Sequence, residues 1–96
     1  LKLDSSNASV IFRELYECLR QAMEAVGYRK GYKFENHESL RVFAEEILQN
    51  SQLAKDFDRY RRIKNGINYY GDSVSVETTA KAILDMQKYI QEISNS

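Results

Sequence analysis

The chain of 96 residues carries fourteen basic and fourteen acidic side chains, so its formal net charge at pH 7 is zero. This balance gives none of the bulk positive charge that is typical of nucleic-acid-binding domains. The length predicts a single domain, 1–96, which buries roughly 60–65% of its unfolded surface on folding.

No apolar run approaches the ~20 residues that a membrane span needs, and no signal peptide is visible. We therefore expect a cytoplasmic protein, although a chain that begins at Leu1 could have lost a processed segment. The sole cysteine, Cys18, excludes an internal disulfide and fits a reducing compartment.

A first helix is predicted over residues 7–26. Ser6 or Asn7 can cap its start, because either side chain can accept from the exposed amides of the first turn. Gly27 can end it, since glycine adopts positive φ readily. The position of Cys18 among apolar residues predicts a buried structural thiol. The expected inner stripe of this helix comprises Ile11, Leu15, Cys18, Leu19, Ala22, Met23 and Val26.

In the loop over residues 27–35, three aromatic residues alternate with three cations. Such a loop could stack the bases and neutralise the phosphates of single-stranded RNA. Alternatively, the aromatic rings pin the loop onto the end of the bundle while the cations stay in solvent. The aromatic residues are Tyr28, Tyr32 and Phe34, and the cations are Arg29, Lys30 and Lys33.

A second helix is predicted over residues 37–49, capped by Asn36. His37 is the only histidine, and we expect it to be exposed in the first turn. We find no ligand-spaced cluster of His, Cys, Asp or Glu, so neither a metal site nor a cofactor is expected. The residues expected to face inward are Leu40, Phe43, Ala44, Ile47 and Leu48.

The central helix is predicted over residues 52–70, and a last helix, capped by Ser75, over residues 76–93. Four helices with short connections favour an all-α, antiparallel up-and-down four-helix bundle. The central stripe comprises Leu53, Phe57, Tyr60, Ile63, Ile67 and Tyr70. The last stripe comprises Val76, Ala80, Ile83, Leu84, Met86, Ile90 and Ile93.

The outer face of the central helix is basic. From Lys55 to Lys64 five basic residues oppose two acidic ones, a net charge of +3. The segment Arg61–Gly71, RRIKNGINYYG, has the form R-x-x-[RK]-N-x-x-x-[HY]-[YG] and precedes a newly capped helix. This pattern resembles the signature of HEPN-domain proteins. Upstream, Gly31–Lys33 and Asn36–Glu38 resemble a second feature of small prokaryotic members, so the similarity covers nearly the whole chain in helix order.

In the HEPN family, the arginine before the asparagine and the histidine five positions later form a ribonuclease site. Lys64 and Tyr69 stand at these positions here, and would be the catalytic residues if the chain were active. Lysine lacks the planar fork that grips phosphate bidentately. Tyrosine, with a pKa near 10, is a poor proton shuttle at neutral pH. Phosphate binding should therefore survive these replacements better than cleavage. The candidate RNA- or nucleotide-binding residues are Arg61, Arg62, Asn65, Asn68 and Tyr70.

Helix geometry constrains this site. Lys64 and Tyr69 are about 140° apart around a continuous helix and cannot point into one pocket. Either the helix ends between them, or two copies of the chain assemble a shared cleft, as the resemblance implies. Arg61, Asn65 and Asn68, in contrast, share one face and suit a site made by one chain.

Three functions remain open on this evidence. The first is a HEPN-like RNA- or nucleotide-binding module, acting as a homodimer or with a minimal nucleotidyltransferase partner. The second is a toxin-like HEPN endoribonuclease that uses the Arg61–Tyr69 motif, as in a toxin–antitoxin pair. The third is a helical domain that binds only other proteins.

Overall fold

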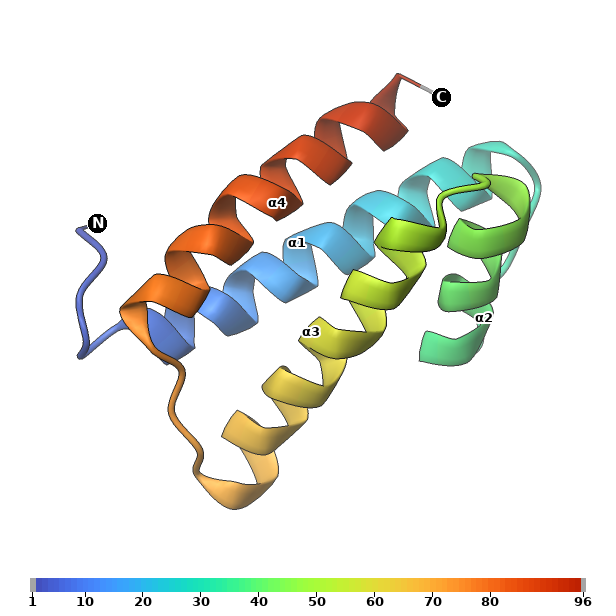
Figure 1. Cartoon of the computed structure of the whole chain (residues 1–96). Helices are drawn as coiled ribbons and strands as arrows, with labels where there is room; N and C mark the ends of the chain where they lie inside the picture. The colour runs from blue at the N-terminus through green and yellow to red at the C-terminus, as the bar shows by residue number, and fades with distance from the viewer. Residues whose placement is uncertain (1, 96) are drawn as a thin grey trace.

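Four α-helices make up most of the protein. The computed structural model describes residues 2–95, and within them no strand is present (Figure 1). A single π-helical turn, η1, continues the second helix directly. The predicted all-α four-helix bundle is confirmed. The elements are α1 Ala8–Arg29, α2 His37–Val42, η1 Phe43–Ile47, α3 Ser51–Tyr70 and α4 Val76–Ser94.

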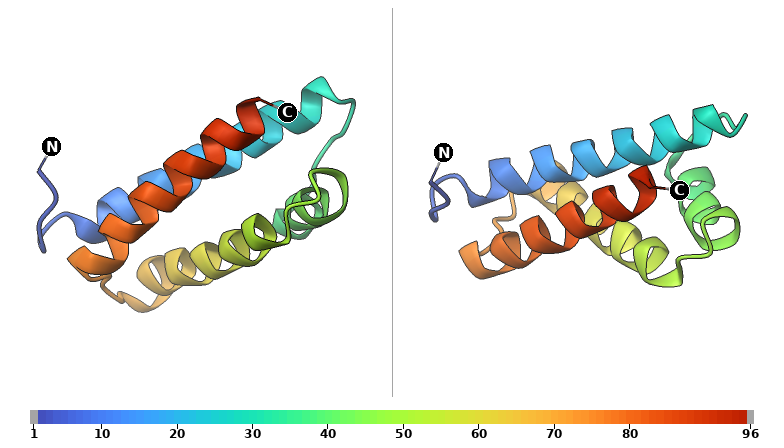
Figure 2. Two further views of the ribbon diagram at one scale, coloured as in Figure 1. Left: turned by 45° about the horizontal axis from the view of Figure 1, so that its top comes forward. Right: turned by 90° about the horizontal axis from the view of Figure 1, so that it is seen from above.

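The helices α1 and α4 lie side by side and run in the same direction, while α3 runs back across them (Figures 1 and 2). Near the starts of α1 and α4, the Thr79 hydroxyl donates to the Ala8 carbonyl at 3.2 Å. Asn50 Nδ2, at the start of α3, lies 3.5 Å from Glu92 Oε2 near the end of α4. Strict alternation of four helices would set α1 and α4 antiparallel. The short α2 and η1 instead pack against the first half of α3, so that α4 returns beside α1 in parallel.

Side-chain caps fix three of the four helix starts. Asn36 and Ser39 form a reciprocal capping box at α2, and Asn50 accepts from the Leu53 amide at α3. Ser75 accepts from the Thr78 amide at α4. Each such cap contributes about 1 kcal/mol by satisfying an amide that the helix leaves unpaired. The capping predicted for α2 and α4 is thereby confirmed.

The prediction that Gly27 ends the first helix is wrong. Gly27 lies buried within α1. The helix continues to Arg29, and the chain turns at Gly31, whose φ is +91°. A Cβ at Gly27 would lie 2.2 Å from Cζ of Phe34. Glycine is present at this position because the Phe34 ring packs directly against the helix backbone.

The buried face of α1 agrees with the predicted stripe at Leu19, Met23 and Val26, and differs from it in the first half of the helix. It includes Phe12, Tyr16, Leu19 and Met23, which follow the helical spacing of four, three and four residues. Phe12 meets the Tyr60 ring edge-on, with a centroid separation of 5.8 Å. The predicted stripe omitted both Phe12 and Tyr16.

Several predictions of burial are wrong, and Ala80, Cys18, Leu84 and Tyr70 are among the exposed residues. Cys18 is exposed, because it lies about 100° around α1 from Leu19, which is in the core. Leu84 is 68% exposed, since it lies two residues from the buried Met86 and so on the opposite face of α4. Tyr70 is 81% exposed, because α3 ends there beyond the reach of the packed core.

The second predicted helix is interrupted by the π-turn. The Leu48 amide donates to the Phe43 carbonyl at 3.0 Å, five residues back, instead of the four of an α-helix. The wider turn rotates Ile47 outward, so that this predicted core residue is 43% exposed. The chain then leaves the turn through Gln49, whose φ is +53°.

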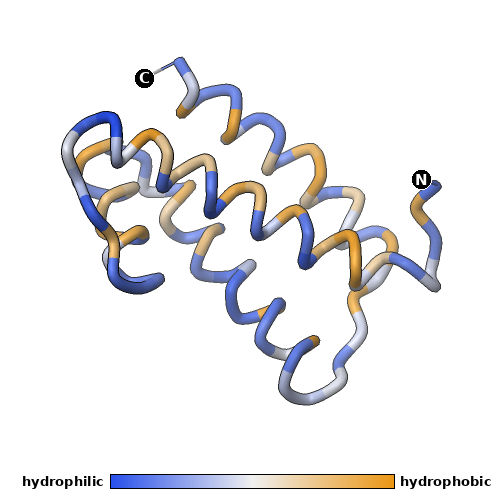
Figure 3. Tube along the Cα trace, turned by 180° about the vertical axis from the view of Figure 1, so that it is seen from behind, coloured by the Kyte–Doolittle hydropathy of each residue, from blue (hydrophilic) through white to orange (hydrophobic). Residues whose placement is uncertain are grey.

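The second half of α3 is polar, in contrast to α1 and α4, along which apolar and polar residues alternate (Figure 3). None of the helices in residues 2–95 combines the length and the apolar character needed to cross a membrane.

Candidate functional site

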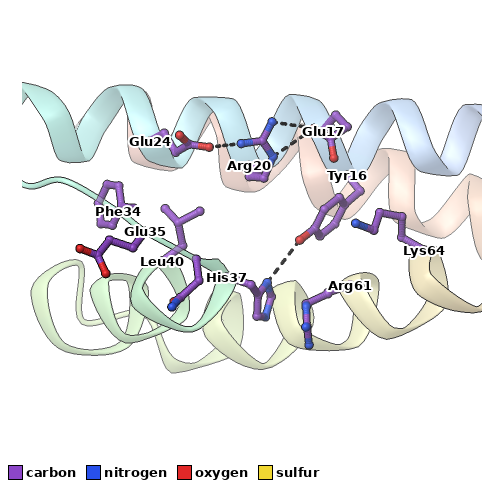
Figure 4. Close-up of a pocket in the computed structure, with 11 residues that line it drawn as sticks. Tyr16, Glu17, Arg20, Glu24, Phe34, Glu35, His37, Leu40, Arg61 and Lys64 are labelled. Atoms are coloured by element: carbon purple, nitrogen blue, oxygen red, sulfur yellow. Dashed lines mark hydrogen bonds and ion pairs between the residues drawn. The ribbon is translucent and has the colours of Figure 1, made fainter. Parts of the chain in front are cut away.

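A pocket of about 330 Å³ opens between α1, the segment that leads into α2, and α3 (Figure 4). α1 contributes Tyr16 and Arg20 to its lining, α3 contributes Arg61 and Lys64, and His37 lies between the two helices. The helix starts that Asn36 and Asn50 cap set the positions of α2 and α3 around this pocket.

A hydrogen-bonded chain crosses the inner end of the pocket. The Tyr16 hydroxyl lies 3.2 Å from Nδ1 of His37, and Nε2 of His37 lies 3.3 Å from Oδ1 of Asp58. Burial raises the pKa of Tyr16 to about 12, so the phenol keeps its proton and donates to Nδ1. Nε2 then carries the imidazole hydrogen and donates it to Asp58. His37 thus has both ring nitrogens engaged within the protein.

The prediction that His37 is exposed is wrong. Only 11% of its side chain is exposed, because the imidazole stacks on Phe57 with a centroid separation of 4.5 Å. Burial lowers the pKa of His37, and the nearby charge of Arg61 lowers it further, against the opposing effect of Asp58. The folded protein therefore favours the neutral imidazole, which links three separate elements and orients the pocket wall.

This burial predicts a loss of stability in mild acid. The lowered pKa means that the unfolded state binds the His37 proton more readily than the folded state does. The stabilisation of the folded state by neutral His37 is fully present above pH ~6.5, the pKa of an unperturbed histidine. It is lost as the pH falls through the folded-state pKa of His37. Urea unfolding of the wild type and of His37→Gln should therefore converge as the pH falls below 6.5. Parallel stability curves across this range would contradict the prediction.

The charges on the two sides of the pocket differ in their availability. On α1, Arg20 is bound to Glu17 at 2.7 Å and also to Glu24, so that its charge is neutralised. On α3, Lys64 Nζ lies 5.1 Å from the centre of the Tyr16 ring, in a cation–π arrangement. Arg61 has no hydrogen bond or ion pair with any residue in the described range 2–95. The α3 side thus offers two cations that no carboxylate occupies.

A second hollow extends the same face toward the end of α3. Lys64 and Asn68 line it from α3, and Arg13 and Glu14 line it from α1. The guanidinium of Arg13 donates to Oδ1 of Asn68 at 3.1 Å. Asn65, at the spacing of the same face, is half-buried. Arg13 was missed by the sequence reasoning, because its partner lies 55 residues away in the chain.

The remaining predicted site residues lie elsewhere. Arg62 points away from the pocket and pairs with Asp58, with Nη1 and Oδ2 3.5 Å apart. Tyr69 and Tyr70 are 74% and 81% exposed and line none of the pockets described above. Because α3 is continuous to Tyr70, the possibility that the helix ends between Lys64 and Tyr69 is wrong. These two residues do not meet within one chain.

Within residues 2–95, no group of three or more His, Cys, Asp or Glu side chains could hold a metal ion. The chain matches no protein-family model, and neither the curated proteins nor the solved structures with which it was compared include a significant match. The resemblance to HEPN proteins therefore rests on the motif in α3 and its surroundings.

Proposed function

We propose that this chain is a HEPN-like module that binds RNA or a nucleotide through its phosphates, acts as a homodimer, and does not cleave RNA efficiently. The observation that carries the proposal is the pair Arg61 and Lys64, which line the pocket without a carboxylate partner. Guanidinium and ammonium groups are the side chains that bind phosphate oxygens most strongly.

The electrostatics of the pocket support phosphate binding at its α3 side. Glu17 and Glu24 also line the pocket, but Arg20 lies between them and binds both. An incoming phosphate therefore meets Arg61 and Lys64 on the α3 wall, while the single charge of Arg20 offsets only one of the two α1 carboxylates. Glu35 also lines the pocket, so phosphate binding is proposed for its α3 side alone. The Asn68 amide and Arg13 extend this polar face beyond the pocket, along the path that a nucleic-acid backbone would follow.

Inefficient cleavage is supported by the chemistry of Lys64 and Tyr69. Within one protomer they face different directions on one continuous helix, and in a dimer Tyr69 would still be a phenol where the family motif has an imidazole. His37, the only imidazole in the chain, has both nitrogens engaged with Tyr16 and Asp58. Neither histidine chemistry nor a Lys–Tyr pair is thus available to RNA in one protomer.

The homodimer is carried over from the resemblance, as is a minimal nucleotidyltransferase as the other candidate partner, and the cytoplasmic location is the expectation drawn from the sequence. A dimer would bring two copies of the α3 face to one cleft. Sedimentation of the protein at micromolar concentration tests this part directly. A monomer at this concentration would contradict the shared cleft. Phosphate binding by the pocket of a single chain is tested separately, by the RNA-binding experiment.

The binding experiment uses a labelled single-stranded RNA whose affinity is measured over a range of salt concentrations. We expect Arg61→Ala/Lys64→Ala to bind about tenfold more weakly, a loss of about 1.4 kcal/mol. The slope of log affinity against log salt should also fall by about 1.4, since each lost single-strand phosphate contact contributes about 0.7.

The matched control is Lys55→Ala/Lys88→Ala, which removes the same charge from exposed positions outside the pocket. Its affinity and salt slope should stay close to those of the wild type. Equal losses in both double variants would mean that overall charge, and not the pocket, holds the RNA.

A further inference from the structure

A second concave surface lies on the far side of the segment that leads into α2. It is a mainly apolar groove of about 470 Å³, between this segment and the outer face of α2 and η1. Tyr32 and Phe34 line it from the segment, and Val42, Phe43 and Ile47 line it from the helical side. Ile47 is among the exposed large apolar residues because the π-turn rotates it outward.

The floor of the groove is held in place by ring contacts. Phe34 packs against Phe43 with a centroid separation of 5.2 Å, and Tyr32 against Phe43 at 5.3 Å. The Phe34 ring is wedged against the backbone of α1 at Gly27, where not even a methyl group would fit. The groove is therefore formed before any partner arrives, which lowers the entropic cost of binding.

Charged residues mark the two walls of the groove differently. Glu38 and Glu46 stand on the helical wall, eight residues apart in the chain, with Glu38 in α2 and Glu46 in the π-turn. Glu38 is held by Arg41, and Glu46 has no hydrogen bond or ion pair with another residue in the range 2–95. On the opposite wall stands Lys33. The apolar floor is thus bordered by two separated carboxylates on one side and one cation on the other.

We propose that this groove binds an amphipathic helix of a partner protein, with basic residues about two turns apart beside its apolar stripe. A helix with anchors at one-turn spacing fills an elongated apolar groove in this way. Two turns of an α-helix contain about seven residues, close to the eight that separate Glu38 from Glu46, since the π-turn between them adds one residue. Neither Arg61 nor Lys64 lines the groove, so the evidence for this proposal does not depend on the RNA-binding proposal.

A second copy of this chain is a poorer occupant. On α4, the exposed Leu84 lies between Lys81 and Lys88 in the sequence and is the segment of a second copy considered for the groove. Lys81 is paired with Asp85 at 2.9 Å, and Lys88 lies 3.9 Å from Glu92. Each of these lysines lies beside a carboxylate of its own helix, so that this face of α4 has no net positive charge to offer Glu46, the carboxylate of the groove that is not ion-paired within residues 2–95.

The test uses two designed helical peptides, labelled with fluorescein, that differ only in charge. Both carry a leucine stripe; one has lysines two turns apart beside it, and the other has glutamates there. Binding to the full chain is measured by fluorescence anisotropy at low salt. We expect the lysine peptide to bind at least tenfold more tightly, and Glu46→Lys to reduce this preference strongly. Ile47→Asp should abolish the binding of both peptides.

Leu84→Asp provides the control, because it places the same charge on an exposed apolar position outside the groove. It should leave both affinities unchanged. Equal affinity for the two peptides, or lysine-peptide binding that survives Ile47→Asp, would overturn the proposal. So would self-association of the wild type that Ile47→Asp abolishes and Leu84→Asp does not, because a second copy would then occupy the groove. If circular dichroism shows that Ile47→Asp does not fold, the test rests on Glu46→Lys. An unchanged preference for the lysine peptide in that variant would then overturn the proposal.

Discussion

Phe57→Ala is expected to lower the free energy of unfolding by about 3–5 kcal/mol. The side chain is fully buried in α3, and its removal leaves a cavity that the surrounding helices cannot close. Phe57 also stacks on Tyr16, with ring centroids 5.4 Å apart and planes within 5° of each other. On its other side lies the His37 ring. One substitution therefore removes the support of both neighbours in the hydrogen-bonded chain.

Urea denaturation followed by circular dichroism measures this effect. Since small domains have a total stability of about 5–15 kcal/mol, the variant should unfold at far lower urea concentration, or not fold at all. Leu84→Ala is the matched control, because it truncates an exposed apolar side chain and should change the stability by less than about 0.5 kcal/mol. A loss below about 1 kcal/mol in Phe57→Ala would show that the stacked rings are not packed as described.

Gly27→Val is expected to destabilise the protein by roughly 2–3 kcal/mol. Its Cβ would overlap the Phe34 ring, 2.2 Å from Cζ and 2.3 Å from Cε2, so the ring must leave its position on α1. The ring would lose its contacts with Tyr28 and Phe43 as well. Because Phe34 lines the apolar groove, binding of the lysine peptide should fall together with stability.

Gly66→Ala separates this steric effect from the ordinary cost of a helical glycine. The nearest group to a Cβ at Gly66 is the flexible, exposed carboxylate of Asp72, which can move away. This variant should gain up to about 1 kcal/mol from helix propensity. Thermal unfolding of the two variants should therefore shift in opposite directions. A Gly27 variant as stable as the wild type would mean that Phe34 repacks without cost.

Local signals in the sequence predicted most of the helical framework. Asn36 and Ser75 are small polar residues that precede apolar periodicity, and both cap helices as expected. Gly71 ends α3 with a φ of +68°, as a glycine after a long helix indicates. These features depend on residues within a few positions of one another, so a single sequence is sufficient to predict them.

The parts that could not be predicted depend on tertiary packing. The π-turn at Phe43–Ile47 has no local signature in the sequence, and Ile47, at its end, is exposed. The stripe of α1 could have been found from the spacing of Phe12 and Tyr16, but a parallel stripe through Cys18 was almost as apolar. Of the candidate site, Arg61 and Lys64 do line one pocket.

The contact of His37 with Tyr16 and Asp58 could not be predicted in the same way. Each pair joins residues 21 positions apart, on three different elements. The relative orientation of α1, α2 and α3 brings these residues together. The sequence periodicity of a single helix gives no information on that orientation. The same reason applies to Arg13, which reaches α3 from the opposite side of the pocket mouth.

Phe34 and Asn36 line both the polar pocket and the apolar groove. The short segment that contains them therefore separates the proposed phosphate-binding site from the proposed helix-binding site. A movement of this segment that enlarges one site changes the shape of the other. By thermodynamic linkage, if a ligand bound in the pocket alters the affinity of the groove for its ligand, the ligand of the groove alters the affinity of the pocket by the same factor.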